Sequence, residues 1–401
     1  MVTILRRVIR RGFAGLFAAA LAAMAPMVAA QQALTPHGSF GSWYGHGLAV
    51  GDGFAAIGTG SSGGFVDVYR RDGGGWQFET SLLPTDSNAF GYRVALGGGW
   101  LAVANRNISA SGWPNYIDLF RRDGGNWTFR QRVAMPFSSA NSAGYVEKLV
   151  VSADALVAST LNIAVEGEIA SIRTYAFDFV DGSWGTAQLL QPPYTANFFG
   201  ESLALSGDLL AVSTWRDRVG PSTGAVSLFR RSGTAWTHVT VVTSPTPAQL
   251  DVGASIALCG NRLAVLAQPL PEQPGPVQNR VLTYTGSGPV WSSEGAPLLS
   301  PTASPNPQYD SFGKRLACSD SALAMMDSQA GKAAVSLTGP RTVQTLSVAL
   351  PSHSPGDSIA VHGGDVLVAD YMGPLGPPNA MPGIVFAFNG AIDAIFAHGF
   401  D

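Results

Sequence analysis

Two overlapping glycine-rich motifs have the spacing of a chemical site. Gly58-Thr59-Gly60-Ser61-Ser62-Gly63 matches a dinucleotide-binding loop, and Ser62 between Gly60 and Gly64 matches a hydrolase nucleophile. Both chemistries need a strand followed by a helix, because the helix N-terminus binds the phosphate and the strained turn exposes the serine. We expect this loop to join two strands, so neither chemistry is predicted.

Acidic and histidine side chains are the other candidates for catalysis. Glycosidases use paired carboxylates, and the candidates for such a pair fall in expected loops: Glu166, Glu168, Asp217 and Asp370. Since most Asp and Glu side chains are solvent-exposed, we interpret these as solvated loop charges. The histidines are scattered without metal-ligand spacing. We therefore predict no catalytic residue.

The elements that would position any site recur along the chain. The fourth copy contains the following parts: Phe199-Gly200, Leu203 to Leu205, Ser206-Gly207-Asp208, Leu209 to Val212, Ala225 to Phe229 and Trp236. Short apolar runs bounded by Gly, Asp and Ser predict strands and hairpins. Seven copies of about 50 residues are countable, the last two degraded. This pattern predicts an all-β, seven-bladed β-propeller of four-stranded antiparallel blades over residues 31–390.

The repeat resembles a known family. Phe-Gly, Ala-Leu-x-Gly-Asp-x-Leu-Ala-Val and Gly-Ala-Val-x-x-Phe-x-Arg are similar to the FG-GAP repeats of integrin α-subunit propellers and their exported bacterial relatives. Calcium-binding members carry several carboxylates in the loop between the first two strands. Here the corresponding loops hold at most one, as in Gly51-Asp52-Gly53, whereas calcium needs six to eight oxygen ligands. We expect no metal and no cofactor.

The two ends of the chain indicate export and leave ring closure open. Four arginines, Arg6 to Arg11, precede an apolar run and Val28-Ala29-Ala30, which predicts a signal peptide over residues 1–30. We therefore expect a secreted, extracellular or periplasmic envelope protein without a membrane span. Gln31 to Pro36 resembles an outer-strand end and could complete the last blade, which we favour; the rival is the tail, residues 391–401, which could be a last strand or a sorting tag.

Composition limits the partners. Removing the leader takes the formal net charge from −3 to −7, which argues against a nucleic-acid partner. Cys259 and Cys318 lie at first-strand ends of consecutive blades, so a disulfide is geometrically allowed, the alternative being two buried apolar side chains. Nothing in the sequence indicates an oligomer, and we expect a monomer.

The variable loops between second and third strands hold the candidate ligand-binding residues. Exposed aromatic and Arg groups there could form a binding rim, although they could equally cover blade edges: Trp113, Trp215, Arg216, Asp217, Arg218 and Tyr371. We therefore predict an exported, non-catalytic recognition module that binds a protein or glycan through one loop face. The alternatives are a propeller hydrolase or lyase acting on polysaccharide, and a structural surface protein.

Overall fold

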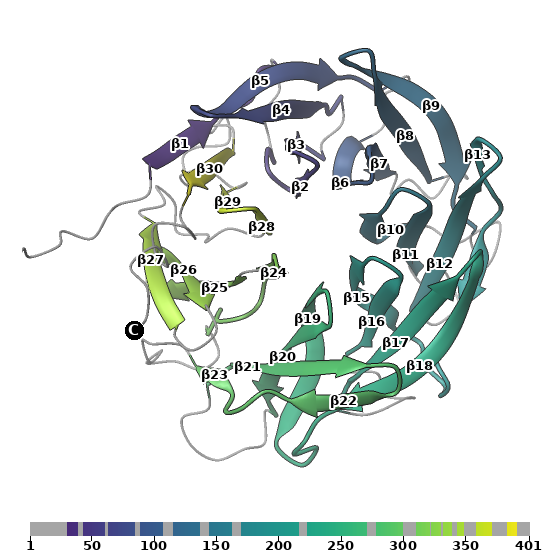
Figure 1. Cartoon of the computed structure of the whole chain (residues 1–401), viewed down its shortest axis with the longest axis vertical. Coiled ribbons are helices and arrows are strands. Elements are labelled where there is room, and N and C mark those ends of the chain that lie inside the picture. Colours follow the sequence, from purple (N-terminus) through teal and green to yellow (C-terminus); the bar gives the residue numbers. More distant parts are fainter. Residues whose placement is uncertain are drawn as a thin grey trace, which may run out of the picture.

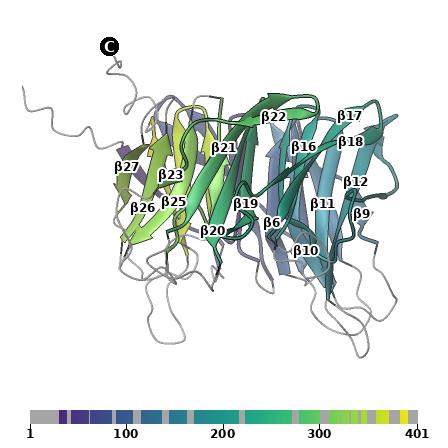
Figure 2. The same ribbon diagram turned by 90° about the horizontal axis from the view of Figure 1, so that it is seen from below.

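The chain forms a ring of small β-sheets around a central axis (Figure 1). A computed structural model describes residues 30–38, 43–60, 63–84, 89–106, 115–136, 144–162, 170–215, 223–270, 278–299, 310–320, 322–329, 332–338, 343–348, 358–370 and 383–390. Within these residues the sheets are antiparallel and have four-stranded paths. The chain is thus an all-β propeller with four-stranded antiparallel blades, and its strands run along the axis of the ring (Figure 2).

The N-terminal part of the ring holds blades whose strands follow in sequence from the axis to the rim. The first comprises β2 (Gly47–Gly51), β3 (Phe54–Gly58), β4 (Val66–Asp72) and β5 (Gly75–Leu82). The next comprises β6 (Ala89–Gly97), β7 (Trp100–Arg106), β8 (Tyr116–Asp123) and β9 (Asn126–Ala134). The third comprises β10 (Gly144–Val151), β11 (Ala155–Asn162), β12 (Ser171–Val180) and β13 (Ser183–Trp184), with β14 (Gln188–Leu190) also paired to β12.

The ring continues with the same strand order. One blade holds β15 (Phe199–Ser206), β16 (Leu209–Thr214), β17 (Ala225–Ser232) and β18 (Ala235–Thr243). Another holds β19 (Leu250–Cys259), β20 (Arg262–Pro269), β21 (Arg280–Ser287) and β22 (Val290–Ser293), with β23 (Leu298–Leu299) paired to β21. The next holds β24 (Leu316–Cys318), β25 (Leu323–Gln329), β26 (Lys332–Thr338) and β27 (Val343–Val348).

The last sheet joins both ends of the chain. It comprises β28 (Ser358–His362), β29 (Asp365–Asp370), β30 (Ile384–Asn389) and, at the rim, β1 (Ala30–Leu34). β1 pairs antiparallel with β30 from Ala30 opposite Asn389 to Leu34 opposite Val385. The N-terminal segment therefore supplies the outer strand of this sheet. The tail, residues 391–401, and the leader, residues 1–29, lie outside the described residues.

The apolar core lies between adjacent blades. One cluster combines Val66 and Val68 of β4 with Phe90, Leu101 and other side chains of the next sheet, all buried. Second strands are buried on both faces, as in β16, whereas rim strands such as β18 are mostly half-exposed. Burial of these apolar faces at roughly 25 cal/mol per Å² holds the blades together.

The Phe-Gly pairs lie where neighbouring blades approach most closely. Gly91 has a φ of 86°, and a β-carbon there would come within 3.0 Å of the backbone of Gly58. Gly200, with a φ of 116°, is similarly close to Thr174. Only glycine accepts such backbone at low cost. The preceding rings are buried, with Phe90 and Phe199 at most 3% exposed, so each pair fills one junction between blades.

Away from the axis, charged side chains of the third strands bind one blade to the preceding one, and we call these contacts the rim pairs. Arg231 of β17 forms ion pairs with Asp178 and Asp154 of the preceding blade. Arg71 of β4 pairs in the same way with Asp365 of the last sheet. The second arginine of the recurring Arg-Arg pair thus contacts the preceding blade.

Backbone groups at the rim are joined by glutamine side chains. Gln32 of β1 accepts a bond from the Trp76 amide at 2.8 Å and donates to its carbonyl at 2.5 Å. Gln131 of β9 bonds the backbone of Trp184 in the same two ways. Gln32 therefore fixes the N-terminal strand to the first blade.

Candidate functional site

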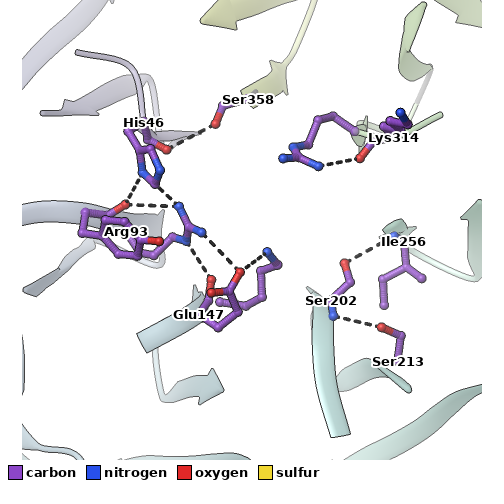
Figure 3. Close-up of polar contacts among 11 residues, drawn as sticks. His46, Arg93, Glu147, Ser202, Ser213, Ile256, Lys314 and Ser358 are labelled. Atoms are coloured by element: carbon purple, nitrogen blue, oxygen red, sulfur yellow. Dashed lines mark hydrogen bonds and ion pairs between the residues drawn. The ribbon is translucent and has the colours of Figure 1, made fainter. Parts of the chain in front are cut away.

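The innermost strands surround a cavity of about 260 Å³ on the axis. Residues near the start of each innermost strand line it, including His46, Arg93, Lys148, Ser202, Arg315 and Ser358. His46 and Arg93 lie on one side of the opening and Ser202 and Lys314 on the other (Figure 3). The propeller thus brings residues more than 300 positions apart in sequence to one wall, since Ser358 Oγ donates to the His46 carbonyl at 3.3 Å with a sequence separation of 312.

Irregular pairing of the innermost strands places these side chains. The register shifts between Phe90 and Arg93 in β6, and between Val146 and Lys148 in β10. A corresponding shift follows Phe199 in β15 and ends at Leu203. Bulges redirect side chains and are common at barrel rims and active sites. Each shift falls beside residues that line the cavity.

Arg93 is the centre of a polar network on this wall. Its Nε donates to the Glu147 carbonyl at 2.7 Å and its Nη2 to Glu147 Oε1 at 3.3 Å. Its Nη1 lies 3.0 Å from His46 Nδ1. Lys148 Nζ also donates to Glu147 Oε1, at 3.0 Å. Two cations therefore share one carboxylate oxygen of Glu147 (Figure 3).

The two acidic residues of this wall have opposite pKa shifts. Burial acts to raise the pKa of Glu147, but Lys148 and Arg93 outweigh it and lower that pKa below the usual value. Burial raises the pKa of Glu201, Lys148 opposes the rise, and the charge of Glu147 adds to it. Glu201 lies on β15 beside the lining residue Ser202. The surroundings thus lower the pKa of Glu147 and raise the pKa of Glu201.

The pKa values of Lys148 and His46 are lowered at this wall. Burial lowers the pKa of Lys148; Glu147 opposes this, and the like charges of Arg93 and Arg315 add to it. Burial and the charge of Arg93 lower the pKa of His46 to about 4, against the opposing effect of the Tyr92 carbonyl. His46 is therefore neutral at neutral pH.

We call the following residues the channel cluster: His46, Arg93, Glu147, Lys148, Glu201 and Arg315. Aromatic rings continue from it across neighbouring blades. His46 stacks with Tyr92 at 4.5 Å between ring centroids, and Tyr92 meets Tyr145 edge-on at 5.4 Å. Trp43 stacks with His46 at 6.0 Å and is 42% exposed. The cluster thus has an exposed aromatic face at one end.

Most of the residues predicted to bind a ligand lie outside the described residues, namely Trp113, Arg216, Asp217, Arg218 and Tyr371. Trp215 is described: it directly follows β16 and is half-buried. It does not line the central cavity. Among the described residues, the structure brings other side chains together at the axis, and the binding rim of loop residues stays a prediction.

The structure also places the two cysteines and the strands on either side of the glycine-rich motif. Cys259 at the end of β19 and Cys318 at the end of β24 form a disulfide with a Cα–Cα distance of 6.1 Å, which joins two blades. The motif around Ser62 lies between β3 and β4, two strands of one sheet, although Ser61 and Ser62 themselves are outside the described residues.

A metal-ligand group and a membrane-spanning helix are both absent from the part of the chain that the structure describes. No three His, Cys, Asp or Glu side chains gather there as metal ligands. No helix there is long and apolar enough to cross a membrane.

The channel cluster was missed because its residues are spread over several repeat copies and form no motif. The signal that would have found them is positional. Charged residues occur one to four positions after a repeat glycine, as in Arg93 after Gly91, Glu147 and Lys148 after Gly144, and Glu201 after Gly200. Comparison of the copies position by position would have placed them on one wall.

Solved structures with a similar fold include a hydrolase and the β-propeller domain of a protease. A puromycin hydrolase is similar with a TM-score of 0.50 and 13% identity over 80% of this chain. The match covers 49% of that protein, so this chain spans about half of its length. The β-propeller domain of the Trilobed protease from Pyrococcus furiosus has a TM-score of 0.52 and 8% identity, over 86% of this chain and 92% of that domain. No family model and no curated protein matches the chain.

The prediction of a non-catalytic recognition module is corrected by these findings. It assumed that no acid–base set converges in the fold. The structure instead places Glu147, Glu201, Lys148 and His46 together at the axis with shifted pKa values, and the propeller fold is shared with a puromycin hydrolase. The likeness itself shows the fold alone. The channel cluster is therefore the basis for assigning a function.

Proposed function

We propose that the chain is a propeller hydrolase that cleaves a glycosidic bond at the channel cluster. The observation that carries the proposal is the pair Glu147 and Glu201 on neighbouring innermost strands beside one cavity, whose surroundings shift their pKa values in opposite directions. Environments that separate the pKa values of two carboxyl groups provide one acid and one base. Glycoside hydrolysis uses such a pair.

The two carboxyl groups have different tasks in this proposal. Glu201 donates its proton to the glycosidic oxygen as the bond from that oxygen to the anomeric carbon breaks. A water molecule adds to the anomeric carbon, and Glu147 takes the proton that the water loses. The bonds from Arg93 and Lys148 both use Oε1 of Glu147, so Oε2 is the oxygen that serves as base.

Two features support a saccharide as the substrate. Sugar rings present C–H faces that pack on aromatic rings, and Trp43 offers an exposed ring beside His46. The cavity of about 260 Å³ is close to the lower size of ligand pockets, roughly 300 Å³. It therefore suits the end of a glycan better than a long chain lying across it.

Release of new reducing ends from a panel of polysaccharides tests the proposal. The mature chain should produce them, and Glu201→Gln should reduce kcat about 10²- to 10⁴-fold, because general acid catalysis contributes that much. Glu79→Gln is the matched control, since Glu79 pairs with Arg122 at the rim. Equal activity of Glu201→Gln and the control would contradict the proposal. Absorbance of an unsaturated product would instead indicate elimination by a lyase.

We also propose seven blades of the FG-GAP type for this ring. The strand pairing supports this count with seven separate four-stranded paths, the last completed by β1. The FG-GAP assignment is supported by the Phe-Gly pairs, whose glycines share positive φ at Gly91 and Gly200. A crystal structure of the chain tests both, and a ring with another number of sheets would contradict the count.

We also propose that the chain is exported to an oxidising compartment. The disulfide between Cys259 and Cys318 supports it, because such bonds persist mainly outside the cytosol. The basic and apolar leader of residues 1–30 supports it independently. Fractionation of cells that express the full chain should find it beyond the inner membrane, starting near Gln31. Recovery of uncleaved protein in the cytosol would contradict export.

A further inference from the structure

We infer that the channel cluster binds an anionic substituent of its glycan, a carboxylate or a sulfate, between Arg315, Lys148 and Arg93. This inference rests on the proposed function, which it sharpens by naming the substrate class. The three side chains come from different blades, β10, β6 and the residue directly before β24, and all three line the same cavity.

The charge of this wall is opposite to that of the protein. Arg93, Lys148, Lys314 and Arg315 line the cavity, whereas the chain as a whole has a formal net charge of −3. The described residues that line the cavity include no carboxylate. Glu147, which contacts Arg93 and Lys148 from beside the cavity, supplies a counter-charge to two of these four cations. A wall with excess cations attracts anions into the cavity.

The cations also interact unfavourably with one another. Arg93 and Lys148 share the single oxygen Oε1 of Glu147. Arg315 and Arg93 both act to lower the pKa of Lys148, which means that each guanidinium repels the Lys148 ammonium group. A bound anion would remove this repulsion. Without a ligand, this arrangement therefore lowers the stability of the fold. With a bound anion, it lowers that stability less.

Neutral donors at the same opening suit an oxygen-rich ligand. Ser202 and Ser358 line the cavity together with Ser255. Ser202 Oγ accepts from the Ile256 amide at 3.4 Å, which leaves its own proton for another acceptor. A carboxylated or sulfated sugar carries hydroxyl groups beside its charge and would meet both kinds of donor.

Calorimetric binding to matched oligosaccharides tests the inference. The probes are tetragalacturonate, its methyl ester, and a sulfated and an unsulfated dextran oligosaccharide, measured with Glu201→Gln, which slows turnover during the titration. The carboxylate or the sulfate probe should bind at least tenfold more tightly than its neutral counterpart, and its affinity should fall with salt. Arg315→Gln should lower that affinity roughly tenfold, which corresponds to about 1.4 kcal/mol, because the variant loses one charged contact with the anion.

The control is Arg262→Gln, because Arg262 pairs with Glu294 on the β20 hairpin instead of at the axis. Equal binding of charged and neutral probes would overturn the inference, as would equal loss in the Arg315 and Arg262 variants. Binding is read with turnover slowed, so the result is independent of the proposed hydrolysis. Anion binding without any cleavage by the native chain would overturn the hydrolase and retain the anion site.

Discussion

Charged side chains have different surroundings at the rim of the propeller and at its axis. At the rim, Arg231 is 11% exposed and has two acidic partners, Asp178 and Asp154. At the axis, Arg93 and Lys148 share one oxygen of Glu147, and Arg315 adds a further positive charge. Rim charges are thus paired across a blade junction, whereas four cations and no carboxylate are found among the described residues that line the axial cavity. From this difference we infer that the rim pairs serve the fold and that the axial cations serve a ligand.

The apolar junctions should have the largest effect on stability. Phe199→Ala removes a ring that is 3% exposed and packs with Phe229 at 6.0 Å. We expect the free energy of unfolding to fall by about 3–5 kcal/mol, from lost burial and the cavity left behind. Urea unfolding of the mature chain measures this. A loss below 1 kcal/mol would show that the junction does not depend on the Phe-Gly ring.

The rim pairs should have the next largest effect on stability. Arg231→Gln leaves Asp178, which is 14% exposed, without its cation. We expect a loss of about 1–3 kcal/mol in the free energy of unfolding, because a largely buried carboxylate then lacks compensation. Arg230→Gln is the control, since Arg230 and Asp208 are both largely exposed. A larger loss in the control would contradict the role given to Arg231.

The pH dependence of kcat should reveal the opposite states of the two carboxyl groups. Activity needs ionised Glu147, so it should rise with pH through a pKa below the usual 4.5. It also needs protonated Glu201, so it should fall as pH passes a pKa above 4.5. Lys148 lowers both pKa values, so Lys148→Met should move both limbs to higher pH. An unmoved profile in this variant would contradict the assignment of the acid and the base.

The N-terminal strand should show the smallest effect. Gln32→Ala removes two bonds to the backbone of Trp76. We expect a loss of about 1–2 kcal/mol, since each such bond contributes roughly 0.5–1.5 kcal/mol. Hydrogen exchange should show faster exchange in β1 and the facing part of β30. Unchanged protection there would mean that the pairing with β30 alone fixes the strand.

The sequence was sufficient to predict the blades because each repeat copy contains the residues that form its own strands and turns. Phe199-Gly200, the Gly207-Asp208 turn and Leu209 to Val212 mark strands that neighbouring residues form locally. The Arg-Arg pairs belong to the same pattern, although the partner of Arg231 in another blade cannot be read from one copy. The fold class and the strand order from axis to rim were therefore predictable.

The axial site was not predictable in the same way. Glu147 and Glu201 lie in different blades. Their pKa values depend on burial and on the position of Lys148 relative to both, and these are set only when the ring has closed. We predicted binding by loop aromatics because Trp and Arg stand out in a sequence. Arg93 and Arg315 stand out less, since each follows a repeat glycine within a predicted strand region, where charge usually points to solvent.

The central claim is that axial charge serves a ligand while rim charge serves the fold. The most direct test measures thermal unfolding and binding of the preferred acidic oligosaccharide for two variants of matched chemistry, Arg315→Gln and Arg231→Gln. We predict that Arg315→Gln keeps or raises the melting temperature and loses binding roughly tenfold, whereas Arg231→Gln lowers the melting temperature and keeps binding. Equal melting temperatures and equal affinities in the two variants would contradict the account.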